Sequence, residues 1–237
     1  MRSRWTVTAG ATAALAVIIA ASAAQAAAPS LKADPRQFVQ NVDNPWFPLQ
    51  PGTIFVYQGS KDGKQGTDIF TVTNRTRVIS GVRCTVIDDT LVLNGKLAEH
   101  TTDWYAQDRA GNVWYFGEKT ATYNDRGRLV SRDGSWLDGV NGARAGIFMF
   151  GNPTVGRTTE QEHYAGHAED HFKVMDRSAS VTVPFGSFNH ALRTKEWTPL
   201  EPGVRDAKYY VHGLGEVKEV TVKGPLEVLN LVQVIRH

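Results

Sequence analysis

From residue 53 to residue 235 the chain alternates between short runs of hydrophobic, β-branched and aromatic residues and short polar turns. Within many runs, apolar and polar residues alternate, which is the pattern of a strand with one buried face. Asn94-Gly95 is a two-residue sequence that favours a tight hairpin turn. We expect strands at residues 54–57, 69–79, 84–93, 97–107, 113–116, 120–123, 161–164, 171–175, 178–183, 192–197, 208–211, 215–222 and 226–235.

These lengths and spacings are typical of an antiparallel meander. The chain shows no repeat and no convincing amphipathic helix, so we predict a mainly β fold: a single antiparallel curved sheet or a partly open β-barrel. Residues 133–156 are rich in glycine, and we expect them to form a long loop over one mouth of the sheet. Gly213 and Gly215 predict a bend or a β-bulge between Tyr210 and Val217.

The N-terminal residues predict export. Arg2 and Arg4 precede a short apolar run over residues 9–24, and Ala24-Gln25-Ala26 offers small residues to a signal peptidase. We predict a signal peptide at residues 1–26, a leader at 27–43 and a single β-rich domain at 44–237. A retained N-terminal anchor is the alternative, disfavoured because the apolar run is short. The mature protein is then secreted, outside the cell or in the cell envelope, without an integral membrane anchor.

The charge balance limits the classes of molecule that the protein can bind, and the cysteine content limits how the fold can be stabilised. The chain has 26 Lys+Arg and 24 Asp+Glu, and removal of Arg2 and Arg4 leaves 24 of each. Nucleic-acid binding needs a basic face, and the cationic residues here are scattered among acids, so we expect no nucleic-acid partner. Cys84 is the only cysteine, which excludes an internal disulfide and requires a hydrophobic core for stability.

Residues 103–118 form the most informative stretch, because two aromatic-rich runs flank a polar turn and an acid stands at each end. Alternation along the first strand places Glu99, Asp103 and Tyr105 on one face. We also expect Trp114, Phe116 and Glu118 to share a face, with Tyr115 opposite. The predicted ligand-binding residues are Glu99, Asp103, Tyr105, Trp114, Phe116, Glu118 and Trp136. The alternative is that the aromatics are ordinary core and the acids a solvated face.

Three histidines, His163, His167 and His171, recur at intervals of four among acidic residues. Imidazole and carboxylate ligands together suit zinc, copper or nickel, so these histidines are a candidate metal site. Gly166 and the strand-like flanking residues argue against the helical zinc motif that the spacing resembles.

Several motifs occur in a fixed order along almost the whole chain after residue 43. They are Asn44-Pro-Trp-Phe-Pro-Leu-x-Pro-Gly52, Asp103-Trp-Tyr-Ala-Gln-Asp108, Gly111-Asn-Val-Trp-Tyr-Phe-Gly-Glu118, Gly134-Ser-Trp136, Ala168-Glu-Asp170, Thr198-Pro-Leu-Glu-Pro-Gly203 and Tyr209-Tyr-x-x-Gly-x-Gly215. With them the chain resembles a family of exported, actinobacterial-type β-rich proteins of unassigned function. Its last motif is similar to that of lipoprotein-type proteins whose curved sheet cups apolar ligands.

No nucleophile elbow, phosphate-binding loop or dinucleotide fingerprint is present, and we expect no cofactor. We predict a secreted bacterial binding protein for a small, mostly apolar ligand, held in an aromatic-lined pocket whose acids fix its polar end. One alternative is a cofactor-free hydrolase, lyase or isomerase that uses paired carboxylates as acid and base. The other is a divalent-metal binder. Whether the protein is an enzyme stays open at this point.

Overall fold

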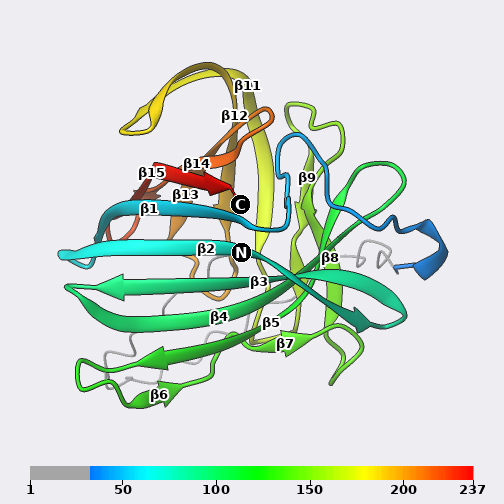
Figure 1. The fold of residues 1–237 in the computed structure, drawn as a ribbon, viewed down its shortest axis with the longest axis horizontal. Helices are drawn as coiled ribbons and strands as arrows, with labels where there is room; N and C mark the ends of the chain where they lie inside the picture. Colours follow the sequence, from blue (N-terminus) through cyan, green and yellow to red (C-terminus); the bar gives the residue numbers. More distant parts are fainter. Residues whose placement is uncertain (1–32, 237) are drawn as a thin grey trace, which may run out of the picture.

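One antiparallel sheet, not closed into a barrel, accounts for nearly all regular structure (Figure 1). The computed structural model describes residues 33–236, so the predicted signal peptide lies outside the described residues, as does the start of the leader. The sheet order is β10-β8-β5-β4-β3-β2-β1-β15-β14-β13-β12-β11-β9, with β6 and β7 also paired to β5. The mainly β prediction is therefore confirmed.

The elements are the 3₁₀ turn η1 (Pro35–Gln37), β1 (Thr53–Lys61), β2 (Lys64–Ile79), β3 (Val82–Leu93), β4 (Lys96–Gln107), β5 (Val113–Tyr123), β6 (Leu129–Ser131), β7 (Trp136–Leu137), β8 (Arg144–Met149), β9 (Thr158–Glu160), β10 (Glu162–His163), β11 (His171–Val183), β12 (Gly186–Trp197), β13 (Arg205–Val211), β14 (Gly215–Lys223) and β15 (Glu227–Arg236). Within residues 33–236, no helix is long and apolar enough to cross a membrane.

Local turn chemistry sets much of this arrangement. Asn94 and Gly95, with φ of 49° and 76°, form the tight turn between β3 and β4, as the sequence predicts. The expected bulge near Gly213 and Gly215 is present, because the register between β13 and β14 shifts at Tyr209/Tyr210. The glycine-rich residues 133–156 are only partly loop, since they also contain β7 and β8, both paired with β5.

The sheet curves so far that its two edges meet. The edge strands β9 and β10 are consecutive in the chain and are separated only by Gln161. β9 also packs beside β8 (Figure 1). Where β8 and β9 lie side by side, their backbones approach closely: a Cβ on Gly146 of β8 would stand 2.4 Å from the carbonyl oxygen of Glu160 in β9. The curvature leaves a concave inner side, where the site described below is built.

The buried amide of Asn44 joins three segments beneath one end of the sheet. Its Nδ2 donates to the carbonyl oxygens of Gly111, at 2.7 Å, and Phe150, at 3.1 Å. Its Oδ1 accepts a 2.8 Å hydrogen bond from the amide of Trp46. The proline-rich segment after the leader is thus held against both the β4–β5 turn and the end of β8.

We predict that Asn44→Ala lowers the free energy of unfolding by about 2–4 kcal/mol, because it leaves buried carbonyl oxygens without a donor. Chemical denaturation measures the change. Asn41→Ala is the matched control, since Asn41 is exposed, and it should shift stability by no more than about 0.5 kcal/mol. Equal effects of the two substitutions would contradict the structural role assigned to Asn44.

Candidate functional site

A β-bulge in β5 decides which side chains of the β4–β5 hairpin face the concave side. Asp103 pairs with Glu118, Trp104 with Gly117 and Tyr105 with Tyr115, so Phe116 is the extra residue. An extra residue reverses the alternation on one side of the bulge. Tyr115 therefore shares the inner face with Asp103 and Glu118, contrary to the alternation expected from the sequence.

Trp114 and Phe116 lie on the opposite face of the sheet. Both rings pack edge-on against Phe38, with centroids 5.8 and 5.4 Å away. The indole Nε1 of Trp114 donates a 2.9 Å hydrogen bond to Asp108 in the hairpin turn. The structure thus separates these two predicted ligand-binding residues from Glu99, Asp103, Tyr105 and Glu118.

The phenol of Tyr115 bridges two buried carboxylates. Its hydroxyl oxygen lies 2.5 Å from Oδ1 of Asp103 and 3.1 Å from Oε2 of Glu118. A phenol has a single hydrogen, so it donates to only one of them. The other short contact requires a protonated carboxyl that donates to the phenol oxygen, and one extra proton is therefore shared within this group.

Burial controls the ionisation of these acids. It raises the pKa of Asp103 to about 6, and together with the carboxylates of Glu162 and Asp103 it raises the pKa of Glu118 well above its ordinary range. Burial and the Asp170 carboxylate raise the pKa of Glu162 to about 8. Trp136 donates from Nε1 to Oε2 of Glu162 at 2.7 Å and fixes that side chain.

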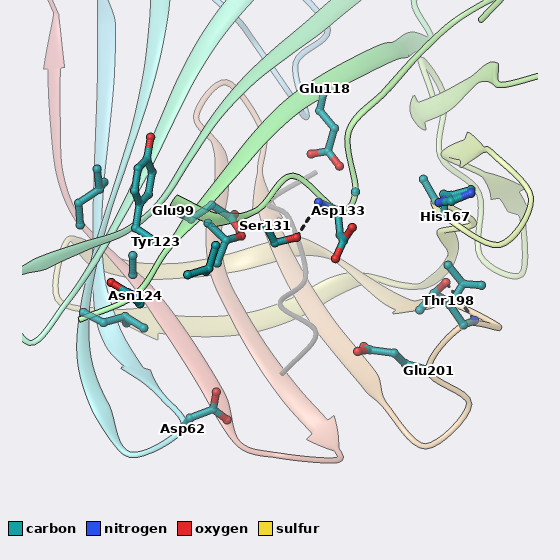
Figure 2. A pocket seen from close by; sticks show the side chains of 18 of the residues that line it. Asp62, Glu99, Glu118, Tyr123, Asn124, Ser131, Asp133, His167, Thr198 and Glu201 are labelled. Carbon is teal, nitrogen blue, oxygen red and sulfur yellow. Dashed lines mark hydrogen bonds between the residues drawn. The ribbon is translucent and has the colours of Figure 1, made fainter. Parts of the chain in front are cut away.

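A cavity of about 1140 Å³ opens in front of Glu118 (Figure 2). Its walls come from β2, β3, β4, β5, β6 and β10 and from the connections β1–β2, β5–β6, β6–β7, β10–β11 and β12–β13. Eight carboxylates line it, against two lysines and one histidine: Asp62, Glu99, Glu118, Asp125, Asp133, Glu162, Asp170 and Glu201, with Lys64, Lys96 and His167. The lining is thus strongly acidic.

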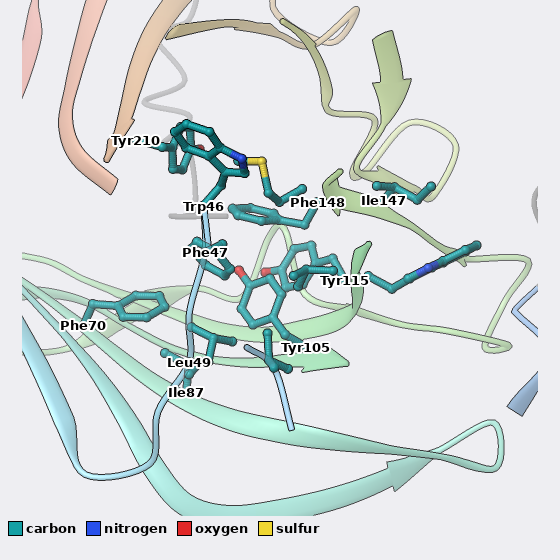
Figure 3. Close-up of a cluster of buried hydrophobic side chains, with 14 of the residues drawn as sticks. Trp46, Phe47, Leu49, Phe70, Ile87, Tyr105, Tyr115, Ile147, Phe148 and Tyr210 are labelled. Carbon is teal, nitrogen blue, oxygen red and sulfur yellow. The ribbon is translucent and has the colours of Figure 1, made fainter. Parts of the chain in front are cut away.

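The predicted aromatic residues pack with each other instead of lining this cavity (Figure 3). The rings of Tyr105 and Tyr115 stack with centroids 4.6 Å apart, and Phe148 and Phe47 pack on Tyr105 at 5.1 and 5.4 Å. Trp136 packs edge-on against Tyr115 at 5.4 Å. The space left beside this cluster has a volume of only about 20 Å³, so the rings form a filled core behind the cavity.

Of the seven predicted ligand-binding residues, Glu99 and Glu118 line the cavity. Asp103, Tyr105 and Trp136 support its floor from behind through the contacts given above. Glu162 and Asp170 were not among the predicted site residues, although both lie in the histidine-containing segment 163–171 or directly beside it. Local alternation gives no signal for Glu162, because it would place Glu160, which is exposed, on the same face.

The three histidines do not converge. His167 stacks on Tyr164 at 4.3 Å and His171 on Trp197 at 5.4 Å, whereas His163 lies 3.7 Å from a carboxylate oxygen of Glu160. Burial lowers the pKa of His171. Within residues 33–236, no group of three His, Cys, Asp or Glu side chains is placed to hold a metal ion. The metal-binding hypothesis therefore has no ligand set in this part of the chain.

A second buried charge cluster lies in the other half of the sheet. Nζ of Lys208 is 3.2 Å from a carboxylate oxygen of Glu196, 3.6 Å from Glu219 and 3.9 Å from Glu216. Tyr210 donates to Glu196 at 3.3 Å. Burial raises the pKa of Glu196 to about 7, although Lys208 opposes the rise. In contrast to the cavity floor, this cluster contains a cation of its own.

Comparison with known proteins gives little beyond the fold. No protein-family model matches the sequence, and no curated protein matches it. One similar solved structure is described as an exported protein with a YmcC-like fold from Bacteroides fragilis (16% identity, TM-score 0.42). Another is described as a lipoprotein from Parabacteroides distasonis (12% identity, TM-score 0.44). Each alignment covers 81% of this chain and 99% of the other.

Neither source organism is an actinobacterium, so these structures do not support the actinobacterial part of the resemblance. Both similarities are too low to transfer a function to this chain. Its family membership and activity therefore rest on its own residues.

We predict that the protein is more stable at about pH 5 than at about pH 8.5. The raised folded-state pKa of Glu162, about 8 against an ordinary 4.5, means that the folded protein binds more protons than the unfolded chain between these values. Stability is then greatest below the unfolded pKa and is lost as the pH rises through the folded pKa. Thermal unfolding across this range measures the loss, which should reach about 2 kcal/mol or more.

The control for this prediction is Glu162→Gln, which imitates the protonated carboxyl and should flatten the pH profile. An unchanged slope in that variant would show that the pH dependence has another origin.

We predict that Lys208→Met lowers the free energy of unfolding by about 3–5 kcal/mol, because it removes a buried cation from three carboxylates. Lys218→Met on neighbouring β14 is the control, since Lys218 is less buried and has no ion pair within the described residues. Denaturant titration at neutral pH compares the two variants. A loss in Lys208→Met no larger than that in Lys218→Met would mean that the cluster does not need its lysine.

Proposed function

We propose that this chain is an exported binding protein, located outside the cell or in the cell envelope, that holds a small molecule in the acidic cavity. The observation that carries the proposal is the cavity itself: about 1140 Å³ of space on the concave side of the sheet, with polar groups converging on its floor. Ligand sites are concave, largely pre-formed spaces of this order, with a few placed polar groups.

The filled aromatic core supports the proposal by fixing the floor rather than by touching the ligand. Glu118 is held by Tyr115, and Glu162 is held by Trp136. Both carboxyl groups therefore have a defined position before any ligand arrives, and pre-organised polar groups reduce the entropy lost on binding.

A cofactor-free acid–base enzyme is the second candidate, because Glu118 and Glu162 both line the cavity and have raised pKa values. A carboxyl that keeps its proton near neutral pH is suited to act as a general acid. This candidate requires a substrate turned over by the wild-type protein and not by Glu118→Gln, whereas a binding protein releases its ligand unchanged.

We predict that Ala98→Trp prevents ligand uptake, because Ala98 is buried in the cavity wall and an indole there would occupy the space. Native mass spectrometry of the mature protein, purified from its own host, should show a bound mass in the wild type and none in this variant. Ala110→Trp makes the same substitution at an exposed position in the β4–β5 turn and should retain the bound mass. A wild-type protein without bound mass, or an occupied Ala98→Trp variant, would oppose the proposal.

A further inference from the structure

The charge of the cavity differs between its depth and its rim. The buried part of its lining consists of Ala98, Glu99, Glu118, Glu162, Ala168, Asp170 and Thr198. It holds four carboxyl groups, and within the described residues no lysine, arginine or histidine lines this part. The two lysines of the lining are closer to solvent, and Lys64 lies 3.5 Å from Asp125 there.

Two of these buried acids keep an oxygen atom without a hydrogen-bond partner. The Oε2 atom of Glu118 is hydrogen-bonded to the hydroxyl of Tyr115, and the Oε2 atom of Glu162 accepts from Trp136. Among residues 33–236, no group donates to the Oε1 atom of either side chain. Both side chains are about 95% buried, at 5% and 4% exposure, and both line the cavity; the carboxylate of Glu118 points into it in Figure 2. A carboxylate oxygen that has no donor and lines a cavity is available to a donor or a cation of a bound molecule.

The rim combines charged and apolar side chains. Leu97 of β4, Val130 of β6 and Leu200 of the β12–β13 connection line the cavity and are 39%, 57% and 43% exposed. Three aliphatic side chains from separate elements are thus available at the rim beside the charged ones. Exposed apolar side chains grouped at a cavity mouth are typical of a ligand-binding groove.

We propose that the ligand is a small amphiphilic organic cation, which binds with its ammonium group between Glu118, Glu162 and Asp170 and its apolar part against Leu97, Val130 and Leu200. This inference rests on the proposed binding function and adds the chemical class of the ligand. The buried carboxylates supply the negative charge that a bound ammonium group needs. The three aliphatic side chains at the rim remove part of the remaining hydrocarbon from water.

Binding of such a cation displaces protons. The groups that face Glu118 and Glu162 from the surrounding elements are almost all acidic or neutral: Glu99, Asp103, Tyr105, Tyr115, Asp133, His167, Asp170 and Glu201. Raised pKa values keep the floor partly protonated near neutral pH. An ammonium group favours the ionised carboxylates, so the protein should release a proton when the ligand binds, and affinity should increase with pH.

The test is a calorimetric titration of the mature protein with octyltrimethylammonium, whose charge does not change with pH. The comparison probes are octanol, octyl sulfate and tetramethylammonium. We expect octyltrimethylammonium to bind at least about 10-fold more tightly than each of them, and its affinity to rise by up to about 10-fold per pH unit between about pH 6 and pH 8.

Glu118→Gln/Glu162→Gln should weaken octyltrimethylammonium binding by about 10-fold or more and abolish its pH dependence, with octanol binding unchanged. Glu160→Gln is the matched control: Glu160 is exposed and outside the cavity, and this variant should bind as the wild type does. Because glutamine imitates a protonated glutamate, the double variant should remain folded, which circular dichroism verifies.

Equal binding of octanol and octyltrimethylammonium, both blocked by Ala98→Trp, would overturn the cation proposal and leave the binding function intact. Unaltered octyltrimethylammonium affinity in the double variant would also overturn it. If none of the four probes bound, the cation proposal would fail, and the bound mass in native mass spectrometry would decide the binding function separately.

Discussion

The hydroxyl of Tyr115 lies between two buried carboxylates and has one hydrogen to donate. This constraint links the fold to the site. The bulge at Phe116 brings Tyr115 onto the inner face, the stack with Tyr105 holds its ring, and Asp103 and Glu118 must share a proton to remain beside it. Glu118 is thereby fixed at the cavity floor, and Trp136, packed on the same ring, fixes Glu162. The acidic floor is a consequence of this aromatic support.

Buried carboxyl groups have different partners in the two halves of the concave side. In the Lys208 half, Glu196, Glu216 and Glu219 surround an ammonium group supplied by the chain itself. At the cavity floor, the hydrogen-bond partners of Glu118 and Glu162 are a phenol and an indole, which are both neutral. A carboxyl group without a cation remains in a buried position by keeping its proton. The cation proposed as the ligand would therefore compete with a proton at the floor.

Most strands could be predicted from the sequence, as could the Asn94-Gly95 turn and the bulge near Gly215. Each of these elements depends on only a few adjacent residues. Sequence patterns also placed Glu99 and Asp103 on one inner face, since β4 alternates without interruption there. The face of Trp114 and Phe116 was inferred wrongly, because nothing local distinguishes Phe116 as the residue that leaves the alternation. The residues that line the cavity could not be predicted from the sequence. Glu118, Glu162 and Leu200 are far apart along the chain, and only the curvature of the sheet brings them into one cavity.

The single residue Gln161, which joins the two edge strands, limits how the sheet can move. Edges that are neighbours in the covalent chain cannot separate by more than one residue allows, so the circumference of the curved sheet is fixed. A protein with one cysteine, Cys84, has no disulfide to provide such a restraint, and here the backbone provides it. The two ends of the sheet are consequently kept side by side by the covalent main chain, without a cross-link between side chains.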